Sequence, residues 1–182
     1  MSGAVLAPGY GGSADQPIIR ALAARLEARG IVTSRIAFST RGRRPSGGYA
    51  TELGELRAAR DALAARAGRP LVLAGRSFGG RMCVLLAAAE PPDAVVVLGH
   101  PISPPGRPRP ADEAALRDIR CPTLIVQGDQ DELGPLAVLE RLAGVNPRID
   151  LVALRGVGHD FGSREREAVD AAAQWLEAIL QA

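Results

Sequence analysis

Short apolar runs alternate along this chain with longer segments in which apolar residues recur at helical spacing. Such runs are typical of strands buried on both faces of a parallel sheet, and such segments are typical of amphipathic helices. The pattern predicts strands over residues 4–7, 31–38, 71–74, 94–98, 122–127 and 149–154. It predicts helices over residues 15–29, 49–67, 81–87, 111–116 and 135–143, and a closing helix for which Ser163 is the expected N-cap.

About six strands alternating with helices predict an α/β fold, a doubly wound and mostly parallel sheet with helices on both faces. The length of 182 residues is that of one domain, and no repeat or linker interrupts the pattern, so we expect residues 1–182 to form a single domain. In open α/β sheets, ligands bind beyond the carboxyl ends of the strands. The loops after the strands are therefore where functional side chains are expected.

Composition removes several function classes. The chain contains no lysine, which excludes Schiff-base lysine chemistry and a phosphate-loop lysine, and its net charge of +2 gives no reason to expect nucleic acid. Cys83 and Cys121 lie in apolar surroundings without a C-x-x-C partner, so we expect two core thiols, and neither a metal nor an organic cofactor. No signal-peptide pattern or membrane-spanning run is present, which favours a soluble cytoplasmic protein without a membrane partner. The bias towards arginine and alanine is typical of a GC-rich bacterial genome.

Residues 75–79 read Gly-Arg-Ser-Phe-Gly and lie between a predicted strand and a predicted helix. This is the context in which G-x-S-x-G forms a nucleophile elbow, a strained turn that exposes the serine hydroxyl. Ser77 is the candidate nucleophile. The alternative is a glycine-rich turn in which Ser77 only caps the following helix.

A serine, an aspartate and a histidine follow different strands in the chain order Ser77, Asp131, His159. That is the order of the triad in α/β-hydrolases, where the imidazole activates the serine and the carboxylate fixes the imidazole tautomer. Asp131 is preferred to Asp129, which we expect to bond the backbone of its own loop. His159 could instead be a surface residue in a helix-entry loop. His100 precedes the aspartates and is expected in the pocket wall.

An oxyanion hole needs two backbone N–H donors. The residue after the nucleophile, Phe78, can supply one, and Tyr10 in the loop after the first strand can supply the other. Gly9 and Gly11 flank Tyr10 and allow close approach, although the same residues could form a plain turn. The remaining pocket candidates are Arg76 and Asp129.

Three arginines, Arg41, Arg43 and Arg44, follow the second strand. They could hold a substrate carboxylate or phosphate, but a solvated loop is the preferred interpretation.

The chain resembles small α/β-hydrolases of the dienelactone-hydrolase-like kind, and within them the testis-expressed-30/KAT8-regulatory-subunit-3-like branch. The resemblance rests on residues 74–81, 99–108 and 127–131, of which the Pro-Pro-Gly run in residues 99–108 is the most specific. It implies a minimal α/β-hydrolase fold with no lid domain, lacking the first two strands of larger members. Pro8-Gly9 stands where hydrolases often have His-Gly, so we expect the loop after the first strand to have a different conformation from theirs.

These observations predict a serine hydrolase that cleaves a carboxylic ester or related acyl bond of a small-molecule substrate in an open pocket. The chain could also form a homodimer. A non-catalytic interaction module with the same fold is the alternative, since fold alone does not confer activity. Acyl transfer to peroxide would use the same three residues.

Overall fold

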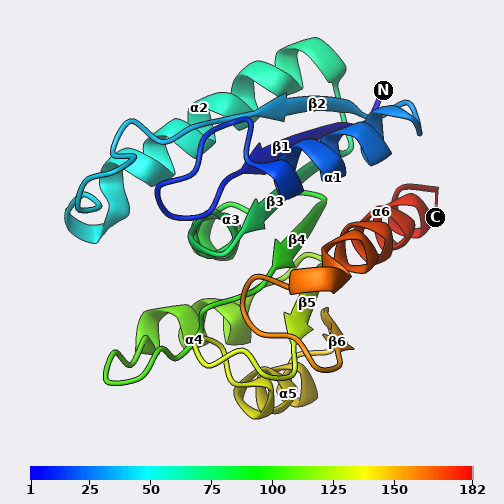
Figure 1. The fold of residues 1–182 in the computed structure, drawn as a ribbon. Coiled ribbons are helices and arrows are strands. Elements are labelled where there is room, and N and C mark those ends of the chain that lie inside the picture. The colour runs from blue at the N-terminus through cyan, green and yellow to red at the C-terminus, as the bar shows by residue number, and fades with distance from the viewer. Residues whose placement is uncertain (182) are drawn as a thin grey trace.

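The computed structural model describes residues 1–181, which contain one six-stranded sheet (Figure 1). Its strands are β1 Gly3–Ala7, β2 Val32–Arg35, β3 Leu71–Arg76, β4 Ala94–Leu98, β5 Thr123–Gly128 and β6 Ile149–Leu154. The spatial order is β2-β1-β3-β4-β5-β6, and every neighbouring pair is parallel. The predicted fold class is confirmed.

Six α-helices connect or follow these strands. They are α1 Pro17–Glu27, α2 Ala50–Ala67, α3 Phe78–Ala89, α4 Pro110–Asp118, α5 Leu136–Val145 and α6 Glu165–Gln181. The chain goes from β1 outwards to β2 and then returns to the other side of β1 to form β3. The strand order therefore reverses between β1 and β3, which is the place where open α/β sheets bind ligands.

Successive strand residues face opposite sides of the sheet and build two cores. On one face, α2, α3, α4 and α5 pack against alternate strand residues, among them Val5, Leu73, Val97 and Ile125. On the other face, α1 and α6 cover the intervening residues, among them Leu6, Val72, Val96 and Leu124. All residues of β1, β3, β4 and β5 are buried. This burial on both faces explains why these strands appear as unbroken apolar runs.

Several element boundaries differ from the sequence-based expectations. β2 ends at Arg35 rather than at residue 38, because its partner β1 ends at Ala7 and the last pairing joins Leu6 to Arg35. The helix after Ser77 begins at Phe78, whereas the sequence pattern predicted a start at residue 81. The closing helix begins at Glu165, since a 3₁₀ turn, Gly162–Arg164, precedes it. Ser163 lies inside that turn, so its prediction as the N-cap was wrong.

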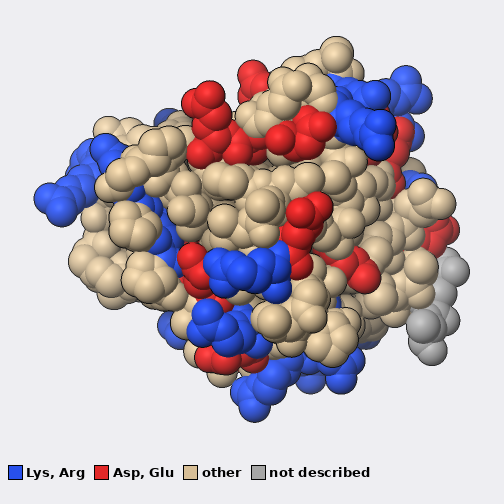
Figure 2. Space-filling model, turned by 90° about the horizontal axis from the view of Figure 1, so that it is seen from below, with Lys and Arg blue, Asp and Glu red and all other residues tan. Residues whose placement is uncertain are grey.

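The surface carries arginines and carboxylates in small groups of both signs, as the face in Figure 2 shows. An ion pair between Arg25 and Asp170 at 2.9 Å joins α1 to α6, and a second pair, between Arg29 and Glu177 at 3.0 Å, joins the turn after α1 to α6. Within residues 1–181, none of the helices has the length and apolar character that crossing a membrane requires.

Candidate active site

Ser77 occupies a sharp turn between β3 and α3. Its backbone has φ 48° and ψ −112°, a conformation that is costly for a residue with a side chain. A Cβ at Gly75 would lie 2.4 Å from the carbonyl carbon of Gly79, and a Cβ at Gly79 would lie 2.4 Å from the Pro8 oxygen. Both positions therefore require glycine. The Ser77 side chain makes no capping bond to α3, unlike the alternative in which it serves only as a cap.

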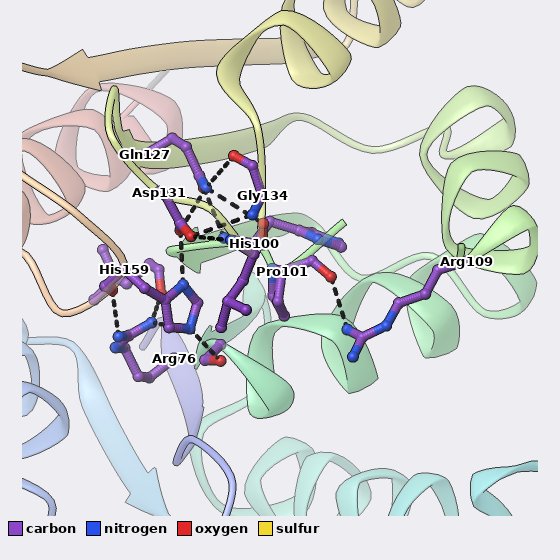
Figure 3. Close-up of polar contacts among 11 residues, drawn as sticks. Arg76, His100, Pro101, Arg109, Gln127, Asp131, Gly134 and His159 are labelled. Carbon is purple, nitrogen blue, oxygen red and sulfur yellow. Dashed lines mark hydrogen bonds and ion pairs between the residues drawn. The ribbon is translucent and has the colours of Figure 1, made fainter. Parts of the chain in front are cut away.

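The Ser77 hydroxyl begins a line of hydrogen bonds through an imidazole to a carboxylate (Figure 3). Ser77 Oγ lies 2.7 Å from His159 Nε2, and His159 Nδ1 lies 2.7 Å from Asp131 Oδ2. The His159 side chain is 22% exposed, while that of Asp131 is fully buried. The structure thus brings together three side chains that follow β3, β5 and β6, in the arrangement that activates a serine as a nucleophile.

The Asp131 carboxylate is fixed by donors besides His159. Its Oδ1 accepts from the backbone N–H groups of Leu133 at 2.9 Å and Gly134 at 3.2 Å. Its Oδ2 also accepts from Gln127 Nε2 at 2.7 Å. These bonds leave the carboxylate one orientation, with Oδ2 directed at His159.

Gln127 is a residue of the site that sequence reasoning missed. It is fully buried at the end of β5, where its Oε1 accepts from the His100 N–H at 2.7 Å and its Nε2 also donates to the Gly134 carbonyl at 2.8 Å. It therefore ties the loop after β4 to the loop that carries Asp131. The available signal was its position at the end of an apolar strand, because a buried amide must find partners.

Arg76 lies beneath His159, as Figure 3 shows. Its Nη1 donates to the Leu98 carbonyl at 3.0 Å and lies 3.3 Å from His159 Nε2, while Nη2 donates to the His159 carbonyl. The guanidinium also lies over the Phe161 ring, 5.5 Å from its centroid. Burial lowers the pKa of Arg76, an effect that Asp131 and other carboxylates oppose. Because arginine stays protonated, a permanent cation holds the His159 loop in place.

The two candidate oxyanion donors lie beside Ser77. Among residues 1–181, no group accepts a hydrogen bond from the backbone N–H of Tyr10 or of Phe78. The Tyr10 and Phe78 rings meet edge to face at 6.1 Å between centroids. The Gly9 N–H donates to Gln16 Oε1 at 2.9 Å, and this bond fixes the first loop.

Asp129 and His100 have surroundings different from those expected. Asp129 Oδ1 accepts from the Gly156 N–H at 2.8 Å, so it bonds the neighbouring loop rather than its own. His100 is fully buried and lines neither cavity at Ser77, which corrects its prediction as a pocket-wall residue. Neither of its ring nitrogens has a hydrogen-bond partner. Burial, followed by smaller effects of Arg81 and Arg109, lowers the pKa of His100 to about 4, while the carboxylates of Asp112 and Asp131 oppose the shift.

Two cavities meet at Ser77 and share Tyr10 and Leu133 as lining residues. The larger cavity, about 470 Å³, lies between Tyr49 and the loop of residues 101–109. The smaller, about 280 Å³, is lined by His159, Arg76, Gln16 and Gly9. Gly11 lines a separate small recess beside Tyr10.

Residues 1–181 contain no group of three histidine, cysteine or carboxylate side chains arranged to hold a metal ion. Cys83 and Cys121 are free thiols in the core, and burial raises the pKa of each.

A parallel sheet with a serine elbow after β3, an acid after β5 and a histidine after β6 defines the α/β-hydrolase class. The model of the family described as alpha/beta hydrolase domain matches residues 2–182, and the chain belongs to this family. No curated protein gives a significant sequence match.

Solved structures include similar chains. An α/β serine hydrolase without a lid from Xanthomonas campestris is 25% identical, with 100% of this chain and 83% of that chain covered and a TM-score of 0.81. A dienelactone hydrolase from Anabaena variabilis is 24% identical, with 99% and 87% covered and a TM-score of 0.81. Est1E from Butyrivibrio proteoclasticus, solved with ferulic acid, is 19% identical, with 100% and 90% covered and a TM-score of 0.83. These likenesses support the dienelactone-hydrolase-like resemblance and a fold without a lid.

Proposed function

We propose that this α/β-hydrolase is a serine hydrolase that cleaves a carboxylic ester or a related acyl bond of a small molecule. The observation that carries the proposal is the unbroken line of hydrogen bonds from Ser77 through His159 to the buried Asp131. A hydroxyl becomes an effective nucleophile only when a positioned base takes its proton, and this line supplies that base.

In the proposed reaction, Ser77 Oγ attacks the acyl carbon while His159 Nε2 takes the hydroxyl proton. Asp131 holds the Nδ1–H of His159 and stabilises the imidazolium that forms. The N–H groups of Tyr10 and Phe78 stabilise the oxyanion of the tetrahedral intermediate. His159 then gives its proton to the leaving alcohol, and an acyl ester remains on Ser77. A water molecule, activated by the same imidazole, hydrolyses that ester and regenerates the serine.

Two observations support an ester of a small or exposed acyl group as the substrate. The fold is shared with Est1E and with a dienelactone hydrolase. The cavities also open at Ser77 without an inserted lid, which suits small or exposed acyl groups. The alternative of a non-catalytic interaction module has no observation in its favour, because it would not need the aligned Ser77, His159 and Asp131.

The proposal includes finer assignments that rest on sequence. We propose that the chain belongs to the testis-expressed-30/KAT8-regulatory-subunit-3-like branch, and the motif in residues 99–108 supports this assignment. We also propose one catalytic domain over residues 1–182, a cytoplasmic location, and a homodimer as the assembly to test.

Hydrolysis of short-chain p-nitrophenyl esters tests the proposal. We expect turnover by the wild-type protein and its loss in Ser77→Ala, with unchanged turnover in Ser163→Ala, which alters an exposed serine in the 3₁₀ turn before α6. Equal turnover in Ser77→Ala and the wild type would refute Ser77 as the nucleophile.

A further inference from the structure

The larger cavity at Ser77 has an unusual charge composition. Four arginines, Arg44, Arg81, Arg107 and Arg109, contribute to its lining, and no acidic residue does. On the face in Figure 2, by contrast, arginines and carboxylates lie beside one another. The cavity therefore gathers positive charge at the proposed nucleophile.

One of these charges is already neutralised. Arg81 is buried and forms a two-bond ion pair with Asp112, at 2.7 Å and 3.0 Å. Burial alone would lower the pKa of Arg81, but its bonds to Asp112 outweigh that effect and raise it. Arg81 thus belongs to the structure of the cavity wall and has no free charge for a ligand.

The other three arginines have no ion-pair partner among residues 1–181. Arg44 and Arg107 are exposed, while Arg109 is half-buried, and its Nη1 donates to the Pro101 carbonyl at 2.7 Å (Figure 3). Burial, and then repulsion from Arg81, lowers the pKa of Arg109. A half-buried cation without a counter-ion is unfavourable, and an anion bound in the cavity would relieve it.

The position of His159 decides which part of a substrate enters this cavity. In the proposed reaction the leaving oxygen must receive its proton from His159 Nε2. His159 lines the smaller cavity, so the leaving alcohol lies there. The acyl chain then extends from Ser77 in the other direction, into the larger cavity.

The apolar part of the lining of the larger cavity suits a short hydrocarbon chain. Tyr10, Tyr49, Phe78 and Leu133 contribute rings and an aliphatic side chain to the same cavity. An acyl chain would cross this apolar part before its far end meets Arg44, Arg107 or Arg109. Guanidinium groups bind carboxylates through paired, charge-assisted hydrogen bonds.

We propose, as an extension that rests on the proposed function, that the substrate is a half-ester of a dicarboxylic acid. Its free carboxylate lies on the acyl side and is bound by Arg44, Arg107 and Arg109. The alcohol part is neutral and leaves through the smaller cavity. This set of arginines differs from the one that the sequence suggested, which was Arg41, Arg43 and Arg44. Only Arg44 of those three lines the larger cavity.

The test compares mono-p-nitrophenyl esters of succinate, glutarate, adipate and pimelate with neutral p-nitrophenyl esters of equal chain length. For the best chain length we expect kcat/KM to favour the half-ester by about tenfold, the scale of one charge-assisted hydrogen bond. The double variant Arg44→Gln/Arg107→Gln should lose most of this preference, measured as the ratio of kcat/KM for the half-ester to kcat/KM for the neutral ester. Because both residues are exposed, the variant should fold.

Arg117→Gln/Arg120→Gln is the matched control, since it removes the same charge from exposed arginines that line neither cavity. It should keep the preference. A salt concentration of about 0.5 M should weaken the preference of the wild type, since salt screens exposed charges. Cleavage of neutral esters with no preference at any chain length would overturn this inference and leave the proposed function intact.

A second pair of probes tests the acyl-side placement. If 4-carboxyphenyl acetate, with its carboxylate on the leaving group, is favoured over phenyl acetate while the half-esters are not, the placement is wrong. Absence of turnover on all these esters, together with no reaction of Ser77 with a fluorophosphonate, would refute both proposals.

Discussion

The two histidines of this chain lie at the same edge of the sheet, one after β4 and one after β6, in opposite environments. Both ring nitrogens of His159 have hydrogen-bond partners, and its side chain is 22% exposed. His100 is fully buried, and neither of its ring nitrogens has a partner. The comparison teaches that a histidine becomes a base through its partners, and that its position after a strand does not suffice.

The physical difference lies in what each ring can do with a proton. In the proposed reaction His159 takes the Ser77 proton, and Asp131 stabilises the resulting charge. Burial lowers the pKa of His100 to about 4 and keeps its ring neutral at ordinary pH. The role of His100 is carried by its backbone, since its N–H bonds Gln127 and so supports the loop of Asp131.

The largest effect should separate the two histidines. We expect His159→Leu to lower kcat for p-nitrophenyl esters by about 10⁵-fold, because the proposed general base is lost. His100→Leu should keep activity within about threefold, because its imidazole makes no hydrogen bond that the leucine would break. Activity assays on both variants, after circular dichroism shows that they fold, measure the contrast. Equal losses would contradict it.

A second pair of variants tests the role of Asp131, the carboxylate that bonds His159. Asp131→Asn should lower kcat by about 10³- to 10⁴-fold, because an amide can stabilise neither the required tautomer nor the imidazolium. Asp129→Asn is the matched control in the same loop. Its side chain bonds only the Gly156 N–H, so we expect less than about a threefold change. If Asp129→Asn lowered kcat more than Asp131→Asn does, Asp129 and not Asp131 would be the carboxylate that supports His159.

The smallest expected effect is on stability and concerns His100. In the unfolded chain its imidazole takes a proton below pH 6.5, whereas in the folded protein its pKa is about 4. Acid therefore favours the unfolded state, and His100 removes roughly 2 kcal/mol from the free energy of unfolding between pH 7 and pH 5. Urea unfolding at these two pH values measures the loss. His100→Leu should lose less stability over the same interval, and an identical loss would refute the account.

Much of the fold was predictable because its strands are buried on both faces. Runs such as residues 94–98 have no polar residue and can only be core strands, and glycines at 75 and 79 mark the elbow. The chain order of Ser77, Asp131 and His159 also predicted which side chains the sheet would bring together. The local sequence pattern was enough to predict a site residue wherever the loop after a strand supplies that residue by itself.

The remaining features depend on contacts between distant segments. Ser163 appeared to be an N-cap, but the turn that brings the His159 loop to α6 takes up that position. His100 and Gln127 bond across two strand ends, and nothing in either local sequence reveals the pairing. Likewise, Arg107 and Arg109 are part of a proline-rich loop in the sequence, and only the folded chain brings them together with Arg44 in the lining of one cavity.

The most direct test of the central claim is labelling with a fluorophosphonate probe, followed by mass mapping of the modified peptide. An activated serine attacks the phosphorus and displaces fluoride, so it becomes covalently labelled where an ordinary serine does not. We expect the wild-type protein to be labelled at Ser77 alone and Ser77→Ala to remain unlabelled. A folded wild-type protein that takes up no label, or takes it up at another serine, would contradict the claim that Ser77 is the nucleophile.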